Sequence, residues 1–311
     1  MHKKIFSNLG ILSGIMVLSF LIPGTVGAAT NAELEARIVA LEAKLAYLTV
    51  NAGTINGLSG PHVIFSGANV HIRNGTGTTN GTVNGTGNVI VGYNEAPSSP
   101  IRGGSHNVLI GSRHNYSSYG GLVTGEENTV SGISSTVSGG RKNVASGFMS
   151  SVNGGINNTA SGTYSSISGG GNDSSQQGNI ASGYLSSVSG GAGNTASGQN
   201  SSVSGGNGNT AGGVDSSVYG GERNRANGRM GSMIGGYNNT ANGEYSAVFG
   251  GTNITANGTF KIGNDIFEPY MKLELGTING LASPNIIFEG ANIHVLSGGN
   301  SSLGNFKIGP N

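Results

Sequence analysis

A phrase of fifteen residues is repeated through the middle of the chain, and this period constrains the fold more than any other feature. Each copy contains a Gly-Gly pair. The pairs begin at Gly139, Gly154, Gly169, Gly190, Gly205, Gly220, Gly235 and Gly250. Their spacing is 15 residues, except for 21 between Gly169 and Gly190, where the stretch from Gly171 to Gly178 holds six additional residues. A fixed short period predicts a solenoid of stacked turns.

Each repeat contains two short apolar phrases in which an inward residue alternates with Ser, Thr or Asn, the period of a strand with one buried face. The first phrase is centred on Val137, Val152, Ile167, Val188, Val203, Val218, Met233 and Val248. The second is Asn-x-Ala-x-Gly, centred on Ala145, Ala160, Ala181, Ala196, Ala211, Ala226 and Ala241. Glycines such as Gly154, Gly190, Gly205 and Gly220 allow the backbone to turn after the first phrase. We therefore predict a mainly β chain, a parallel β-roll with two strands in each turn of about fifteen residues.

A column of valine and alanine is a thin core for one chain. Burying one valine contributes roughly 1.5–3 kcal/mol, whereas fixing fifteen backbones costs on the order of 15–30 kcal/mol. Ladders of identical Asn and Ser close part of this gap, and we expect a further surface between chains. The candidate for that surface is the column Met149, Tyr164, Leu185, Asn200, Asp215, Met230 and Tyr245. The alternative is that these are ordinary exposed loop positions.

The repeat SSVxGGxxNTASGxx resembles that of YadA-like heads in trimeric autotransporter adhesins, which carry SVAIG-type and AxAxG-type phrases. The resemblance is strongest over residues 121–258. It implies a left-handed parallel β-roll with three chains packed side by side. The second phrase fits the family well, whereas the first has Gly-Gly where the family often has an apolar residue before glycine.

The N-terminal residues 1–28 have the features of a secretory signal peptide. Lys3 and Lys4 give a positive start, an apolar run extends from Ile11 to Ile22, and Val26-Gly27-Ala28 is a small-residue cleavage site. The alternative is an uncleaved anchor helix. The 311-residue chain has no cysteine and a net charge of +1. These features are compatible with export, and they give no indication of nucleic-acid binding, which favours a basic stripe.

Residues 29–52 follow a heptad pattern typical of a short coiled-coil helix. Apolar side chains step by four and three residues. The seam consists of Leu34, Ile38, Leu41, Leu45 and Leu48. We expect this helix to set the number of chains in a homotrimer, and the alternative is an amphipathic helix lying on its own head.

The stretch 53–72 is repeated near the other end of the chain at 276–295, with most positions identical. Val63-Ile64-Phe65 and Ile286-Ile287-Phe288 are the strongest strand signals in the sequence. We interpret both copies as caps, because the ends of a solenoid need atypical sequence. The predicted order is an initial cap and irregular turns at 53–120, regular repeats at 121–258, a connecting neck at 259–275 and a second cap-like module at 276–311.

The sequence offers little for catalysis, so we predict that the chain is not an enzyme and uses no cofactor or metal. Aspartate occurs only at Asp173, Asp215 and Asp265, too far apart in the sequence to indicate a paired-carboxylate site. Four histidines lie in the entry region at 53–120 but match no metal-ligand spacing, and we expect a structural role for them. They are His62, His71, His106 and His114.

These observations favour a secreted or surface-exposed structural and adhesive protein of a bacterium. Its partners would be itself, as a homotrimer, and extracellular matrix, glycan or another cell surface. Residues 259–311 lack the alternating ten-residue strands of an outer-membrane barrel, so we expect none to be encoded there. Two alternatives remain: a phage-spike-like protein that binds or depolymerises carbohydrate, and a solenoid that binds ice through Ser and Thr columns.

Overall fold

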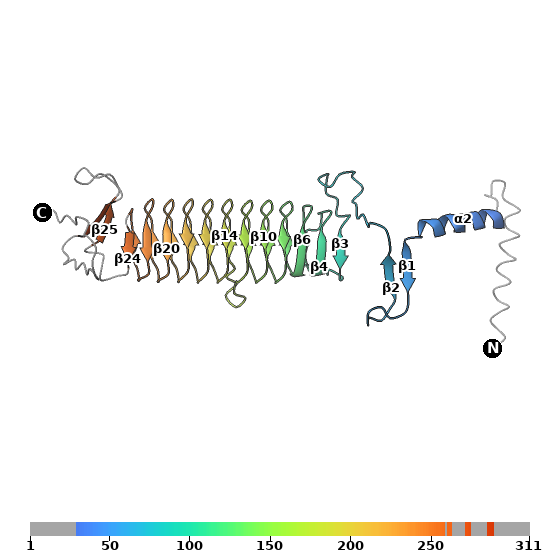
Figure 1. Cartoon of the computed structure of the whole chain (residues 1–311), viewed down its shortest axis with the longest axis horizontal. Coiled ribbons are helices and arrows are strands. Elements are labelled where there is room, and N and C mark those ends of the chain that lie inside the picture. The colour runs from blue at the N-terminus through green and yellow to red at the C-terminus, as the bar shows by residue number, and fades with distance from the viewer. Residues whose placement is uncertain (1–28, 259, 263–270, 275–284, 289–311) are drawn as a thin grey trace, which may run out of the picture. The chain divides into compact units, whose positions relative to one another are not determined.

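The computed structural model describes residues 29–258, 260–262, 271–274 and 285–288 (Figure 1). The chain divides into two units, residues 1–71 and 72–311, and each is described here by itself. The predicted signal peptide at 1–28 and most of the second cap-like module lie outside the described residues. Among the described residues, no helix combines the length and apolar character needed to span a bilayer.

The first unit contains helix α2 (Asn31–Lys44) followed by a β-hairpin. Alanine, leucine and glutamate favour the helix, and a capping box starts it. The Glu33 amide donates to Thr30 Oγ1 at 3.3 Å, and the Thr30 amide donates to Glu33 Oε2 at 2.7 Å. The latter hydrogen bond lowers the pKa of Glu33. Strands β1 (Leu48–Asn51) and β2 (His62–Phe65) then pair antiparallel, which confirms the strand predicted at 63–65.

The helix is shorter than the sequence predicted. Leu45 is its C-cap, and Leu48 lies in β1, where it pairs with Phe65. The β-branched Thr49 and Val50 favour a strand over a fourth helical turn. The predicted seam is therefore helical only at Leu34, Ile38 and Leu41.

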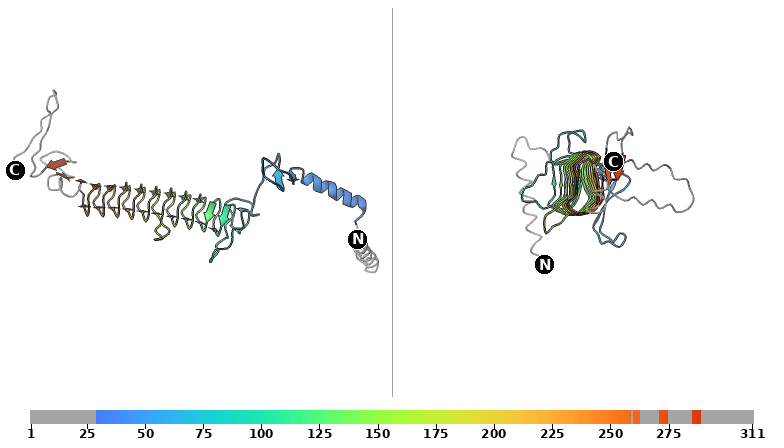
Figure 2. Two further views of the ribbon diagram at one scale, coloured as in Figure 1. Left: turned by 90° about the horizontal axis from the view of Figure 1, so that it is seen from below. Right: turned by 90° about the vertical axis from the view of Figure 1, so that its left-hand side faces the viewer.

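The second unit is a parallel β-solenoid built from two sheets, as the repeat predicted. The first sheet has twelve strands: β3 (Val89–Val91), β4 (Val108–Ser112), β6 (Leu122–Glu126), β8 (Thr136–Val137), β10 (Ser151–Val152), β12 (Ser166–Ile167), β14 (Ser187–Val188), β16 (Ser202–Val203), β18 (Ser217–Val218), β20 (Ser232–Ile234), β22 (Ala247–Phe249) and β24 (Phe260–Ile262). The second has ten: β5 (Asn115–Tyr116), β7 (Thr129–Val130), β9 (Val144–Ala145), β11 (Thr159–Ala160), β13 (Ile180–Ala181), β15 (Thr195–Ala196), β17 (Thr210–Ala211), β19 (Arg225–Ala226), β21 (Thr240–Ala241) and β23 (Thr255–Ala256). Viewed end-on, successive turns superimpose (Figure 2).

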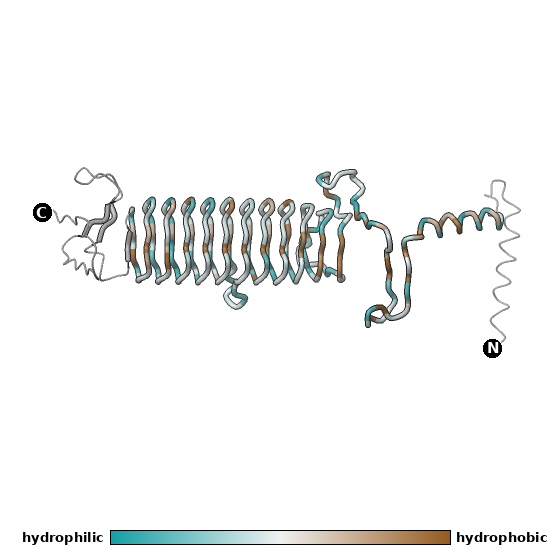
Figure 3. Tube along the Cα trace, viewed as in Figure 1, coloured by the Kyte–Doolittle hydropathy of each residue, from teal (hydrophilic) through white to brown (hydrophobic). Residues whose placement is uncertain are grey.

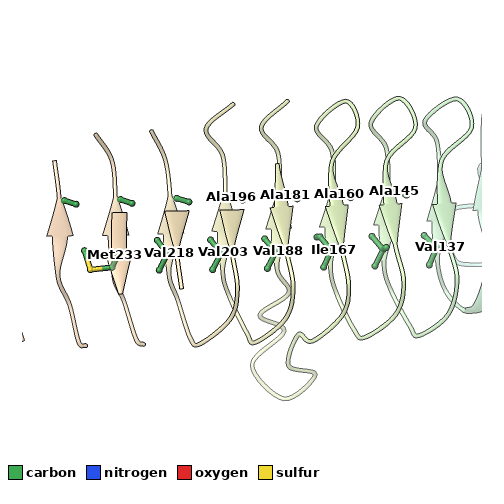
Figure 4. Close-up of a cluster of buried hydrophobic side chains, with 14 of the residues drawn as sticks. Val137, Ala145, Ala160, Ile167, Ala181, Val188, Ala196, Val203, Val218 and Met233 are labelled. Carbon is green, nitrogen blue, oxygen red and sulfur yellow. The ribbon is translucent and has the colours of Figure 1, made fainter. Parts of the chain in front are cut away.

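The core is two parallel stacks of side chains, one from each sheet (Figure 4). Equivalent residues pair in register, for example Val152 with Ile167 and Ala160 with Ala181. The predicted core residues are all almost completely buried: Val152, Ala160, Val188, Ala196, Val203, Ala211, Val218 and Ala226. Hydrophobic positions consequently recur at the same height on successive turns (Figure 3).

A ladder of buried asparagines adds side-chain hydrogen bonds between successive turns to the small apolar core. The Oδ1 atom of each accepts from the backbone amide of its counterpart in the next turn, as at Asn194 to Asn209, 3.0 Å. Its Nδ2 donates to two carbonyl oxygens, those of Gly190 and Gly206 for Asn194. The ladder consists of Asn128, Asn143, Asn158, Asn179, Asn194, Asn209, Asn224 and Asn239.

Glycine is required mainly at the second position of each Gly-Gly pair. Gly155 has φ = 84°, and a Cβ there would lie 2.1 Å from the carbonyl oxygen of Gly170 in the next turn. A Cβ on Gly154, the first member, would contact nothing within 4 Å, and the same holds for Gly190, Gly205 and Gly220. The requirement for glycine at Gly154, Gly190 and Gly205 therefore belongs to the glycines that follow them, whereas Gly220 has φ = 158°, a conformation that side chains rarely adopt.

The solenoid extends beyond the predicted limits of the regular repeats. The irregular turns predicted before residue 121 contain β3, β4 and β5, with a richer core that includes Leu109 and Tyr116. At the other end β24 pairs with β22, so part of the predicted neck is a further strand of the sheet. Strands β25 (Met271–Glu274) and β26 (Asn285–Phe288) then pair antiparallel, as β1 and β2 do.

Candidate functional site

One edge of the solenoid is a series of identical four-residue turns. In the turn Gly147 to Ser150, the Ser150 amide donates to the Gly147 carbonyl oxygen at 3.2 Å, and Met149 has φ = 51°. The Met149 amide donates to the carbonyl oxygen of Ile133 in the preceding turn, 2.9 Å away. This contact between turns fixes the left-handed conformation and orients the side chain.

The column predicted as a surface between chains occupies this third turn position throughout. Its members have φ between 51° and 58°. They are Met149, Tyr164, Leu185, Asn200, Asp215, Met230 and Tyr245, and Ser134 precedes them in the same position. The structure thus confirms that the column exists as a continuous line on one edge.

A second column lies directly beside the first, at the preceding residue of each turn, and the sequence analysis did not identify it. It is apolar at Ile133, Phe148, Tyr184 and Val214. The signal was present, because apolar residues recur there at the same repeat position. We call the combined surface the apolar ridge. It consists of Ile133, Phe148, Met149, Tyr164, Tyr184, Leu185, Val214, Met230 and Tyr245, all between 37% and 50% exposed.

The aromatic members of the ridge pack against one another along the solenoid. Phe148 and Tyr164 meet edge to face with ring centroids 5.5 Å apart, and Tyr164 and Tyr184 do so at 5.8 Å. Such pairs contribute about 0.5–1.5 kcal/mol beyond their burial. The three rings therefore form an ordered surface.

The backbone conformation of the ridge costs conformational free energy. A non-glycine residue in the left-handed region costs about 1–2 kcal/mol, and glycine, of which the chain has 59, avoids that cost. Beneath the ridge, the buried hydroxyls of Ser150, Ser165, Ser186 and Ser201 have no hydrogen-bond partner among the described residues. Large apolar side chains that are kept at such positions in spite of this cost indicate a functional surface.

The ridge becomes polar toward its C-terminal half. Asn200 Nδ2 donates to Asp215 Oδ1 at 2.8 Å, and Arg229 Nη1 lies 2.9 Å from Glu244 Oε1. The hydrogen bond with Glu244 raises the pKa of Arg229. The apolar surface is therefore densest between Ile133 and Leu185.

The opposite edge also contains a column in the left-handed conformation, but its side chains are polar or absent. We call it the polar edge. The column runs through Arg113, Glu127, Lys142, Asn157, Gly193, Gly208, Arg223, Asn238 and Asn253. The six-residue insertion also projects from this edge (Figure 1).

The seam of helix α2 is exposed. Leu34, Ile38 and Leu41 are 44–56% exposed, and no residue of the helix is buried against the described part of the chain. Leu45 at the cap is exposed to a similar degree, and Leu48 is half-buried. The first unit thus has an apolar surface of its own.

Several of the residues considered for catalysis and metal binding have structural contacts, among them His62 Nε2, 3.1 Å from the Leu58 carbonyl oxygen, and His106 Nε2, which accepts from the Asn74 amide at 3.2 Å. Asp173 pairs with Arg141, Asp215 accepts from Asn200, and Asp265 lies outside the described residues. His114 is completely buried and takes the place of an asparagine at the start of the ladder: its Nδ1 accepts from the Asn128 amide, and its Nε2 lies 3.1 Å from the Ile110 carbonyl oxygen. Within the described ranges, no three His, Cys, Asp or Glu side chains are grouped to hold a metal ion.

The Thr and Ser columns of the second sheet face outward but are interrupted. Thr159 and Thr195 occupy equivalent outward positions, and the residue between them in the stack is Ile180. Arg225 interrupts the same column further on. These interruptions limit the regular hydroxyl array that ice binding requires.

No protein-family model matches the chain, and a search among curated proteins finds no significant relative. The fold and the two edges are therefore the basis for a functional proposal.

Proposed function

We propose that this chain is an exported, non-enzymatic repeat protein that assembles as a homotrimer and presents its solenoid on a bacterial cell surface for adhesion. The observation that supports the proposal is the apolar ridge. Its tyrosines, leucine and methionines occupy positions where glycine would relieve backbone strain. Contiguous exposed apolar surfaces of this kind mark interaction sites.

Other copies of this chain are the occupant that we propose for the ridge. Completing the burial of a half-exposed Tyr or Leu contributes on the order of 1 kcal/mol, and the ridge repeats that gain over successive turns. The exposed seam of α2 supports the same conclusion, because a heptad pattern is satisfied by partner helices. A net charge of +1 places little electrostatic repulsion between copies.

The remaining solenoid faces would then be available to a target. They are rich in Ser, Thr and Asn side chains, which offer hydrogen bonds without a strong net charge. We propose a matrix protein, a glycan or a neighbouring cell as the target, with no cofactor and no nucleic acid. The signal-peptide pattern at 1–28 supports export.

The mass in solution tests the assembly. We expect residues 29–311 to have the mass of three chains by light scattering, and the triple variant Tyr164→Ser, Tyr184→Ser, Leu185→Ser to have a lower mass with its β-sheet spectrum retained. The matched control is Lys142→Ser, Asn238→Ser, Asn253→Ser on the polar edge, which should keep the wild-type mass. A folded wild-type monomer would refute the assembly.

Adhesion is tested separately with the purified wild-type protein. We expect saturable binding to at least one member of a panel of immobilised matrix proteins, glycans and whole cells. Absence of binding across the panel by a protein of confirmed mass would refute the adhesive function and leave a spacer role.

A further inference from the structure

A polar pocket of about 480 Å³ lies on the polar edge, beside the six-residue insertion. This volume is within the range of small-molecule sites, roughly 300–1,000 Å³. Two features produce the pocket: the insertion forms one wall, and three successive turns have glycine, Gly178, Gly193 and Gly208, at a position where other turns have side chains.

The glycine gap forms the floor. The left-handed column has Asn157 before the insertion and Arg223 beyond the gap, but Gly193 and Gly208 lie between them. A Cβ on Gly208 would meet its nearest atom, Cγ of Arg223, at 3.6 Å, so the space is sufficient for a side chain. The chain thus leaves room at two adjacent positions that accept asparagine in other turns.

The insertion is a folded wall. The Asn172 amide donates to the Gln177 carbonyl oxygen at 2.9 Å, and Asn172 Oδ1 accepts from the Ser174 amide at 3.0 Å. Asp173 pairs with Arg141 of an earlier turn. These contacts hold Gln176 and Gln177 over the pocket.

The side chains lining the pocket share one chemistry. Asn157, Gln176, Gln177 and Asn207 each carry an amide that donates and accepts hydrogen bonds, and Thr159 adds a hydroxyl. Such groups match the hydroxyls of a sugar. Asn157 Nδ2 is buried beside the pocket without a hydrogen-bond partner among the described residues. Ile180, 41% exposed, offers an apolar contact for the C–H face of a ring.

Arg223 is the charged residue of this lining, which contains no carboxylate. Its Nη1 donates to the Tyr237 hydroxyl at 2.8 Å, and its guanidinium lies 5.8 Å from the centre of that ring. Glu222 is 3.7 Å from Nε. Tyr237 is therefore a positioning residue. Nη1 is held by Tyr237 and Nε faces Glu222, so Nη2 is the guanidinium nitrogen that remains available to an anion.

We infer that this pocket binds an acidic sugar, with its carboxylate on Arg223 and its hydroxyls on the surrounding amides. The inference rests on the proposed adhesive function and assigns it a ligand class and a site. The pocket lies on the edge opposite the apolar ridge, so binding and self-association can be measured independently.

Calorimetry with matched soluble sugars tests the inference on residues 29–311. The pairs are sialyllactose with lactose, methyl glucuronide with methyl glucoside, and methyl galacturonide with methyl galactoside. We expect at least one acidic member to bind about tenfold or more tightly than its neutral partner, as a charge-assisted hydrogen bond predicts. Equal binding within every pair, or no binding, would overturn the inference.

Three variants locate the binding. Arg223→Met removes the charge and keeps the stem, and Gly208→Asn fills the floor with a residue that this column accepts elsewhere. Deletion of residues 172–177 restores the fifteen-residue spacing and removes the wall. Each should weaken binding of the acidic sugar about tenfold or more with the β-sheet spectrum unchanged.

The matched control is Arg229→Met, which removes an arginine from the opposite edge and should bind normally. An equal loss in Arg229→Met and Arg223→Met would show non-specific charge attraction and overturn the site. The mass of every sample is measured in parallel. A trimer that binds no acidic sugar refutes the pocket alone, whereas a monomer that binds one refutes the assembly alone.

Discussion

The two edges of the solenoid share a left-handed backbone conformation, but one carries polar side chains and the other apolar side chains. Both hold residues at positive φ in almost every turn, and on both the conformation is fixed by amide hydrogen bonds to a neighbouring turn. On the polar edge these residues are Asn, Lys, Arg, Glu or Gly, whereas on the ridge they are largely Met, Tyr and Leu. Because the backbone requirement is the same, the difference reflects what each edge meets.

The edges also differ in whether the buried polar groups behind them find hydrogen-bond partners within a single chain. Behind the polar edge, each ladder asparagine uses its Oδ1 and Nδ2 atoms in hydrogen bonds to adjacent turns. Behind the ridge, four successive buried serine hydroxyls have no partner among the described residues. The buried ladder is therefore satisfied within a single chain, whereas these serine hydroxyls, and Nδ2 of Asn157 on the polar edge, have no partner among the described residues. What distinguishes the ridge is its exposed apolar side chains, which assembly would bury.

The largest predicted effect on stability is in the asparagine ladder behind the polar edge. Asn194→Ala removes the acceptor of the Asn209 amide and the donor to the Gly190 and Gly206 carbonyl oxygens, all in a buried site. We expect the free energy of unfolding to fall by about 2–5 kcal/mol, measured by denaturant unfolding. Gln199→Ala, an exposed side chain on the ridge edge outside the left-handed position, is the control and should change little. Similar losses in the two variants would contradict the importance of the ladder.

The sequence predicted the solenoid almost completely because its period, its valine and alanine columns and its turn glycines are all local features. It also located the six-residue insertion and the strands at 63–65 and 286–288. It placed too much of residues 29–52 in the helix, because the heptad spacing continues to Leu48 although β1 begins there. Pairing with β2 decided the structure of that segment, and such pairing is not a local property of the sequence.

The candidate sites were less predictable. One column of the ridge could be read from the repeat, but its backbone conformation could not, since bulky residues at positive φ oppose local preference. The pocket depends on which turns lack a side chain beside an insertion. Gly193 and Gly208 look like ordinary turn glycines until Gln176 and Gln177 are placed over them.

The first position of the ladder predicts a pH effect. Burial lowers the pKa of His114 below 6.5, and the charge of Arg102 acts in the same direction, although the hydrogen bond to Ile110 opposes it. The folded chain then binds fewer protons than the unfolded chain below about pH 6.5, so the free energy of unfolding falls as the pH falls through that range.

His114→Asn is the matched variant for this effect, because asparagine occupies the equivalent place in the following turns. We expect the variant to lose part of the acid sensitivity between pH 7 and pH 5, measured as the difference between the two denaturation profiles. Identical profiles would show that protonation of His114 does not affect stability.

Backbone strain on the ridge predicts an inverted order of two substitutions. At Leu185, glycine relieves the left-handed strain that alanine retains, so Leu185→Gly should be more stable to unfolding than Leu185→Ala by about 0.5–1 kcal/mol. At Ser187, in strand β14, the same pair should show alanine as the more stable. Denaturant unfolding at one protein concentration measures both, and the ordinary order at Leu185 would argue against strain.

The smallest effect is predicted at the polar end of the ridge. Arg229 and Glu244 lie 2.9 Å apart, but both side chains are more than half exposed, so solvent screens their attraction. Glu244→Gln should leave the thermal unfolding midpoint and the mass in solution unchanged, whereas the triple substitution at Tyr164, Tyr184 and Leu185 should lower the mass. A lower mass in Glu244→Gln would mean that the ion pair lies within the contact between chains. The interface would then extend into the polar half of the ridge, and apolar burial between Ile133 and Leu185 would explain only part of the assembly.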